Sequence, residues 1–302
     1  MFFTCFFQML ALAILILVGY LVGRKQMADN HTMTQISALI GVLFNPMLLI
    51  SSAISSMHSV ELSSWFLLLL FVIAMFLVFI ALSYLFAPFF DRRKGQKEMY
   101  QMMFVFGNFG YMGIPVVKGV YGEEYTVYVL AFIFAFNLFF YTFGVTIMSG
   151  GFSLKSLKGM LNTGTLSCLV AVLLLLFKPD LPSFLTTAVE YLGSVTSPLA
   201  MLAVGITVAG ADLKAIFTNP KMYLFTLLRM ILIPLVSIPI IHLLPFDATV
   251  LGIILIEIGM PVANMTLVIG TEKGVDCSNC SASIIMTTLL SVLTIPVLLT
   301  LI

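Results

Sequence analysis

The segment GNFGYMGIPVV, residues 107–117, decides how this chain folds. It lies inside an apolar run long enough to cross a membrane, yet it holds three glycines, an asparagine and a proline. Proline removes a backbone donor and clashes with the preceding turn, while glycine lets the backbone leave helical geometry. In a bilayer, bare backbone is tolerated only where it is buried in protein or lines a wet cavity. The segment therefore predicts a membrane helix that breaks inside the protein.

Composition sets the class of protein. Of the 302 residues, 61% are hydrophobic and 9% are charged, whereas soluble domains carry about 25% charged residues. Apolar runs of about 20 residues predict α-helical spans and not barrel strands. The expected fold is an all-α polytopic membrane protein with ten spans, at 3–23, 34–57, 64–87, 99–121, 125–149, 160–177, 186–210, 221–243, 248–270 and 281–302.

Charged loop residues predict the orientation. Loops after even-numbered spans hold only Lys118 and Lys178. Loops after odd-numbered spans hold eleven basic residues: Arg24, Lys25, Arg92, Arg93, Lys94, Lys97, Lys155, Lys158, Lys214, Lys221 and Lys273. Because basic residues favour the cytoplasmic side, both termini are expected outside the cytoplasm, in a multi-pass protein of the inner (plasma) membrane. The first charges follow the first apolar run, so that run is interpreted as a retained helix and not a signal peptide.

Two short signatures indicate an internal repeat. NPMLLIS from Asn45 resembles SPLAMLA from Ser197, and GIPVV from Gly113 resembles GMPVA from Gly259. Each pair occurs in the same order and at similar spacing, which predicts two five-span repeats, residues 1–150 and 151–302. Because five is odd, the second repeat enters the membrane from the opposite side, as in the inverted repeats of secondary transporters.

The prolines of the repeated motif locate the expected breaks. Pro115 and Pro261 would each free the carbonyl four residues earlier, on Tyr111 and Glu257. Each break exposes the N-terminus of a half-helix, where unpaired amides and the helix dipole favour an anion. A packing kink is the alternative for either proline alone, but the paired occurrence favours two half-helix ends directed at one central place.

At these residues the chain resembles the auxin efflux carrier family, whose bacterial members include malate and malonate permeases. The resemblance covers nearly the whole chain, through FNPMLLISSAI, GNFGYMGIPVV, RMILIP, MPVAN and SIIMTTLLSVLTIPVL. It implies spans four and nine that cross at their prolines, a scaffold of spans 1, 2, 6 and 7, and a transport domain of spans 3–5 and 8–10 with an elevator-like movement. The long cytoplasmic loop of the plant carriers is absent here, which favours an organic-acid carrier of bacterial type.

Candidate substrate-binding residues cluster around the expected crossing. The resemblance places Asn108 in the substrate site, with a local helix cap as the alternative, and Asn264 occupies the corresponding half-helix. Asn137 and Tyr141 share a helix face at i, i+4, where interhelical hydrogen bonding is the alternative to substrate contact. The backbone-bending members of the predicted site are Gly110, Gly113, Pro115 and Pro261.

Arg229 and Glu257 are the charged residues well inside the apolar spans, and such groups are functional hypotheses by default. Counted along their helices, their depths differ by only about 5 Å, so they could pair. One interpretation makes Glu257 a proton-coupling carboxylate and Arg229 a substrate-binding anion attractor. The other makes them a static ion pair between spans eight and nine.

The sequence thus predicts a secondary carrier of small organic anions such as dicarboxylates, with possible proton coupling. A sodium-coupled carrier of bile-acid-symporter-like architecture and a passive anion channel are the alternatives. Enzyme motifs such as HExxH and GxSxG are missing, so an enzyme is not expected. No nucleic-acid partner and no cofactor are expected. A metal site is not expected either, since Cys277 and Cys280 form a lone CxxC without further ligands. The expected partners are the anion and the lipid bilayer, with homodimer formation left open.

Overall fold

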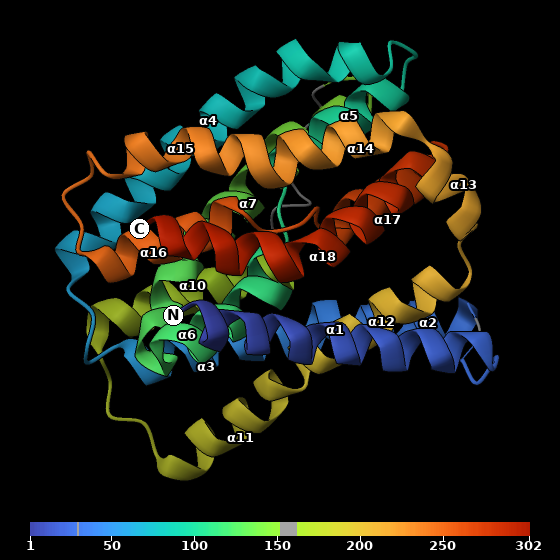
Figure 1. The fold of residues 1–302 in the computed structure, drawn as a ribbon. Helices are drawn as coiled ribbons and strands as arrows, with labels where there is room; N and C mark the ends of the chain where they lie inside the picture. Colours follow the sequence, from blue (N-terminus) through green and yellow to red (C-terminus); the bar gives the residue numbers. More distant parts are fainter. Residues whose placement is uncertain (29, 152–161) are drawn as a thin grey trace.

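A computed structural model describes residues 1–28, 30–151 and 162–302. Apart from one isolated bridge, these residues form no β-structure. Seven helical runs are long and apolar enough to cross a membrane: Phe2–Arg24, Gln35–Ser56, Leu62–Phe90, Glu123–Met148, Ser183–Ala209, Pro220–Ile241 and Ser278–Leu301. Most helices run alongside one another between two ends of the molecule (Figure 1).

Apart from α13, which lies in a predicted loop, the described helices overlap the ranges of the predicted spans. Their bounds in the first half are α1 Phe2–Arg24, α2 Asn30–Leu39, α3 Asn45–Ser56, α4 Leu62–Phe90, α5 Gln96–Val105, α6 Ile114–Tyr121, α7 Thr126–Phe139 and α8 Val145–Met148. Those in the second half are α10 Thr163–Phe177, α11 Ser183–Ser194, α12 Thr196–Ala209, α13 Leu213–Thr218, α14 Pro220–Leu227, α15 Ile233–Ile241, α16 Ala248–Ile258, α17 Asn264–Glu272 and α18 Ser278–Leu298. Lys155, Lys158 and the start of the predicted span 160–177 lie outside the described residues.

The predicted spans 99–121 and 248–270 are each divided into two helices. In the first, α5 ends at Val105, and the chain resumes helical structure at Phe109 through the π-helical segment η2, Phe109–Gly113, which runs into α6. In the second, α16 ends at Ile258 and α17 begins at Asn264. The non-helical gaps are thus short, at 106–108 and 259–263.

Proline shapes the continuous helices in a second way. Three of the π-helical segments in the described chain end two residues before a proline: η1 (Ile40–Phe44) before Pro46, η2 before Pro115, and η5 (Leu228–Leu232) before Pro234. Proline lacks a backbone N–H and crowds the carbonyl four residues earlier, and a widened turn relieves that crowding. These prolines therefore rotate the helix face without breaking the helix.

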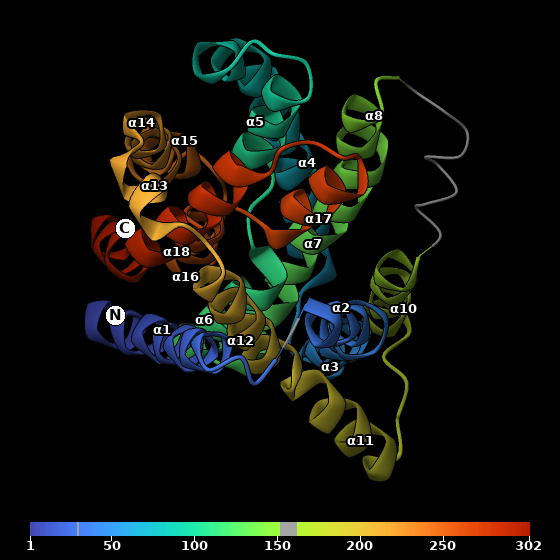
Figure 2. The same ribbon diagram turned by 90° about the vertical axis from the view of Figure 1, so that its right-hand side faces the viewer.

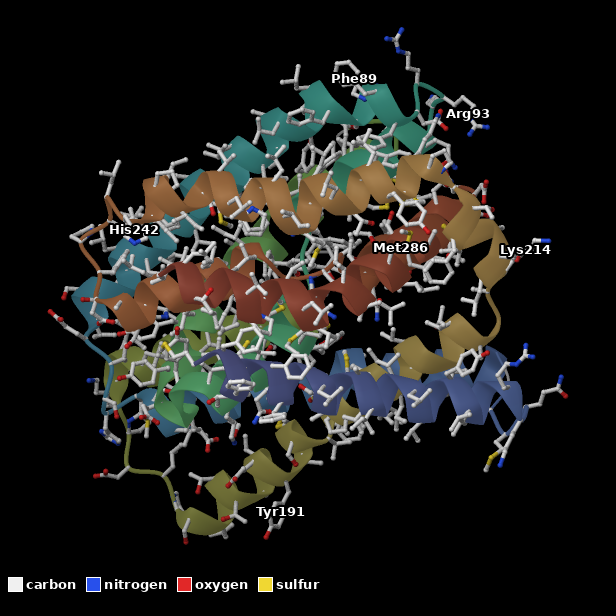
Figure 3. The ribbon with its side chains drawn as sticks, viewed as in Figure 1. Phe89, Arg93, Tyr191, Lys214, His242 and Met286 are labelled. Carbon is white, nitrogen blue, oxygen red and sulfur yellow. The ribbon has the colours of Figure 1, made fainter. Side chains whose placement is uncertain are left out.

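The two ends of the molecule differ in what they carry. Both termini lie at the left end in Figure 1, together with the turn after α15, where His242 is labelled in Figure 3. Arg93, in the turn between α4 and α5, and Lys214, on α13, lie at the opposite end. The loops that hold Arg93 and Lys214 therefore lie at the end away from the termini.

Close helix packing builds the lower half of the molecule in Figure 1. α1 packs along α12, and α3 packs against α10 and α11 (Figure 2). Small residues allow the first contact: a Cβ added to Gly19 would overlap the backbone of Leu202, and one added to Gly205 would overlap that of Ile16. Apolar side chains such as Phe89 and Tyr191 point outward, with 72% and 70% of their surface exposed (Figure 3), as expected for faces that contact lipid.

Candidate functional site

The two breaks pair with each other and form the centre of the site. Asn108 N donates to the carbonyl of Pro261 at 2.8 Å, and Ala263 N donates to that of Phe106 at 3.0 Å. Gly107 and Val262 form an antiparallel bridge between these bonds. Backbone groups that would be bare in lipid thereby satisfy one another, which is what burial away from water demands.

Gly107 leaves room at the crossing for two side chains. A Cβ added to Gly107 would stand 2.8 Å from the ring of Phe109 and 3.0 Å from Nη2 of Arg229. Both distances are shorter than ordinary contact between carbon or nitrogen atoms. A larger residue than glycine at position 107 would therefore have to displace one of these side chains.

Pro115 does not mark the first break, contrary to the expectation from sequence. It lies in the first turn of α6, whereas the crossing falls at residues 106–108. The wide π-helical turn of η2 accommodates Pro115, which has no backbone N–H to donate, so the helix continues through the proline. Pro261 does lie in its break, but the carbonyl of Glu257, expected to be freed, accepts a hydrogen bond from Met260 N at 3.1 Å.

A cavity of about 280 Å³ lies against the crossing. Five predicted site residues line it together: Asn108, Gly110, Asn137, Tyr141 and Asn264. Both half-helices that follow the breaks, starting at Phe109 and Asn264, begin at its wall. In the first of these, the earliest intrahelical bonds are donated by Met112 and Gly113 to Asn108 O, so the preceding amides are available to a ligand. No charged side chain of the described chain lines this cavity.

The polar side chains of the cavity differ in their present partners. Asn108 is 6% exposed, and its side chain makes no capping bond to the half-helix that follows it. Asn264 likewise begins α17 without capping it. Asn137 Nδ2 donates to Sγ of Cys168 at 3.4 Å, so an interhelical contact does accompany its position at the cavity. Because the Asn108 side chain makes no capping bond, it does not act as a local helix cap in this structure.

The facing wall contains residues that sequence reasoning left out. Asn45, the first residue of α3, lines the cavity, and its Oδ1 would be 3.8 Å from a Cβ added to Gly110. Thr163 and Gly164, at the start of α10, complete this wall. Asn45 opens the repeat signature NPMLLIS, so an amide directly before a proline in that repeated motif was the signal that could have identified it.

The remaining predicted site residues lie off the cavity. Gly113, Pro115, Pro261, Arg229 and Glu257 do not line it. Arg229 is fully buried, Nη1 donates to the carbonyl of Ile258 at 2.7 Å, and Nη2 lies behind Gly107.

The static ion pair between Arg229 and Glu257 is not formed. Glu257 is also fully buried, but its carboxylate is directed at Gly113, where an added Cβ would overlap it. Among the described residues, neither carboxylate oxygen has a hydrogen-bond or salt-bridge partner. Arg229, on η5, reaches Gly107 and the carbonyl of Ile258, whereas Glu257, on α16, reaches Gly113, so similar depth in the membrane was not sufficient for pairing.

Two further cavities extend from the crossing. Asn264 also lines a cavity of about 100 Å³, which shares Thr207, Leu267 and Ser281 with a vestibule of about 820 Å³. The vestibule lies between the α12–α13 region and the ends of α17 and α18, and the exposed carboxylates of Asp212 and Asp276 line it. Hydrogen bonds from the hydroxyl and backbone N–H of Ser278 hold the pKa of Asp276 below its usual range.

No group of three His, Cys, Asp or Glu side chains in the described ranges is placed to hold a metal ion. Cys277 and Cys280 are free thiols, the first at the vestibule and the second buried beside Thr266. The site thus consists of backbone ends, amides and hydroxyl groups.

A polytopic helical protein with broken, mutually paired helices beside a polar cavity has the architecture of a membrane transport protein. A family model described as "Membrane transport protein" matches residues 4–155 and again 152–299, and the chain belongs to this family, the auxin efflux carrier family of the sequence resemblance. An "Uncharacterized transporter" of Methanocaldococcus jannaschii is 30% identical over 302 residues, covering 95% of each chain. A "Putative malonate transporter" of Rhizobium meliloti is 30% identical over 216 residues, covering 65% of this chain and 64% of its own.

Proposed function

We propose that this protein is a secondary carrier of small organic anions, and that it binds them in the cavity at the crossing. The observation that carries the proposal is the convergence of two half-helix N-termini on an uncharged, amide-lined cavity. Each such end bears about half a positive charge and presents unpaired N–H groups. Asn108 and Asn264, one from each half-helix, can add side-chain donors to a carboxylate.

Two inverted repeats would explain why the crossing has two similar halves. The proposed repeats at 1–150 and 151–302 are supported by the two matches of the family model, whose ranges nearly coincide with them. The antiparallel pairing of the breaks also suits helices that enter from opposite sides. In this proposal the broken helices count as one span each, which gives ten spans with both termini outside the cytoplasm.

Elevator-like movement is supported by the position of the cavity between two groups of helices. One wall comes from η1 and α10, which belong to the proposed scaffold of spans 1, 2, 6 and 7. The opposite wall comes from the crossing and from α7, which belong to the proposed transport domain of spans 3–5 and 8–10. Movement of one group against the other would expose a bound anion to alternate sides of the membrane.

The series of cavities supports a state open to the cytoplasm. It leads from Asn264 to the vestibule beside α13, at the same end as Lys214 (Figure 3). We take this end as cytoplasmic because it collects the basic loops. Glu257, buried without a partner beside the half-helix of Gly113, remains the candidate for a coupled proton.

Uptake into proteoliposomes tests the function. Labelled malonate and malate, with related mono- and dicarboxylates, should enter saturably and should show counterflow when unlabelled anion is preloaded. Asn108→Ala should lower malonate uptake about tenfold or more, because an amide bond to a charged group is worth about 1.5–3 kcal/mol. Size-exclusion profiles of both proteins control for folding. Unchanged uptake by Asn108→Ala would remove this residue from the site, and linear, unsaturable flux would indicate a channel.

A further inference from the structure

Two half-helices lead into the crossing, and their C-terminal ends lie on the side opposite the N-terminal ends described above. α5 ends at Val105 and α16 ends at Ile258, directly before the two breaks. Each C-terminal end carries about half a negative charge, on carbonyls that lack intrahelical donors. In carriers built from broken helices, such ends and unwound carbonyls are where a coupling cation binds.

Arg229 occupies this place with its own side chain. Nη1 donates to the carbonyl of Ile258 at 2.7 Å, so the guanidinium caps the end of α16. Nη2 would stand 3.0 Å from a Cβ on Gly107, two residues past the end of α5. The group therefore reaches from one break to the other.

Charge balance supports the same assignment. Arg229 is 0% exposed and forms no ion pair with any carboxylate of the described chain, including Glu257, which is directed at Gly113. An isolated buried charge is very costly, so it needs compensation from fixed dipoles. The C-terminal ends of α5 and α16 would together supply about one negative charge. Nη1 contacts the end of α16, while Nε and Nη2 have no hydrogen-bond acceptor in the described part of the chain.

We propose that Arg229 is a built-in cation at the two half-helix C-termini, and that the carrier consequently needs no sodium ion at its crossing. Arg229 is thus a positioning residue that holds the crossing together and does not touch the anion. The inference concerns the ion requirement of the proposed carrier, but its first test needs no transported substrate.

The first test is chemical rescue of a shortened side chain. Arg229→Ala leaves a buried space at the C-terminal ends, and free guanidinium chloride, far below denaturing concentrations, should fill it. The melting temperature of purified Arg229→Ala should rise by about 2 °C or more in guanidinium chloride relative to choline chloride at equal ionic strength. The matched control Arg24→Ala, at an exposed arginine that ends α1, should show no such rise. An Arg229→Ala protein that is stable and indifferent to guanidinium would overturn the inference.

The second test compares cations on the unmodified protein, which remains informative if Arg229→Ala does not fold. Its melting temperature and its malonate uptake should be the same in sodium, potassium and choline chloride. Arg229→Lys should keep more folded protein than Arg229→Ala, because it keeps the charge. A sodium-specific increase in stability or uptake would overturn the inference. Absence of uptake for every anion would instead contradict the proposed function, while the melting data would still decide the role of Arg229.

Discussion

The two sides of the crossing are made from the same broken helices, but one side faces a cavity and the other side is filled by a buried side chain. On the N-terminal side, the positive half-helix ends face a cavity lined by neutral amides, Asn108 and Asn264 among them. On the C-terminal side, Arg229 is buried and caps the end of α16 through the carbonyl of Ile258, with its Nη2 beside Gly107 after the end of α5. A broken helix creates two ends of opposite partial charge, and in this protein the positive ends face the cavity while a buried arginine contacts the negative side.

The most damaging change to this arrangement should be Gly107→Ala, because Gly107 separates the two sides. The added Cβ must displace the ring of Phe109 or Nη2 of Arg229, and overpacking of this kind costs about 1–3 kcal/mol. We expect a lower melting temperature and loss of malonate uptake. Gly210→Ala is the matched control for stability, since its nearest neighbour to an added Cβ is 3.8 Å away. Equal melting temperatures for the two variants would show that the crossing tolerates a looser approach.

Glu257→Gln should affect coupling more than folding, because the amide keeps the shape of the buried side chain and cannot carry a proton at neutral pH. We expect uptake driven by an inward pH gradient to fall about tenfold, while exchange of malonate without a gradient persists. Glu190→Gln, at an exposed glutamate on α11, should leave both unchanged. Retention of gradient-driven uptake by Glu257→Gln would place the coupled proton elsewhere or exclude coupling.

Asn45→Ala tests whether the facing wall contributes to anion binding. Loss of one amide donor to a carboxylate should raise the apparent KM for malonate about tenfold, with a smaller change in maximal rate. Initial rates over a malonate concentration series measure both quantities. A changed maximal rate at constant KM would mean that Asn45 acts in the movement of the helices and not in binding.

The comparison also separates what the sequence could predict from what it could not. Apolar run lengths located the helices, and the repeated GIPVV and GMPVA motifs located the two broken spans. The first crossing was nevertheless misplaced at Pro115, because a proline preceded by a π-helical turn does not end a helix. The direction of side chains could not be predicted either. Depth in the membrane suggested a pair between Arg229 and Glu257, whereas Arg229 contacts the carbonyl of Ile258 and Glu257 points at Gly113.

The thiol of Cys277 can be used to test from which side of the membrane the anion reaches the half-helix N-termini at the crossing. Cys277 lines the vestibule and is partly exposed, whereas Cys5, Cys168 and Cys280 are buried. A negatively charged thiol reagent added from the cytoplasmic side should slow malonate uptake several-fold, since it adds bulk and like charge on the proposed route. Cys277→Ser should abolish the inhibition. Inhibition only from the outer side would reverse the assigned orientation.

The smallest expected effect comes from Asp276, one of the two exposed aspartates, with Asp212, in the described lining of the same vestibule. Its pKa is lowered by the hydrogen bonds from Ser278 and, to a smaller extent, by the charge of Arg93, so the group stays ionised at neutral pH and repels an approaching anion. Asp276→Asn should therefore raise malonate uptake at subsaturating concentration by about twofold at low ionic strength. The gain should shrink in added salt, because exposed charges more than about 10 Å apart are largely screened at 0.1 M. A gain that ignores salt would mean that the substitution acts on the structure of the α17–α18 turn, and that the vestibule does not steer the anion by charge.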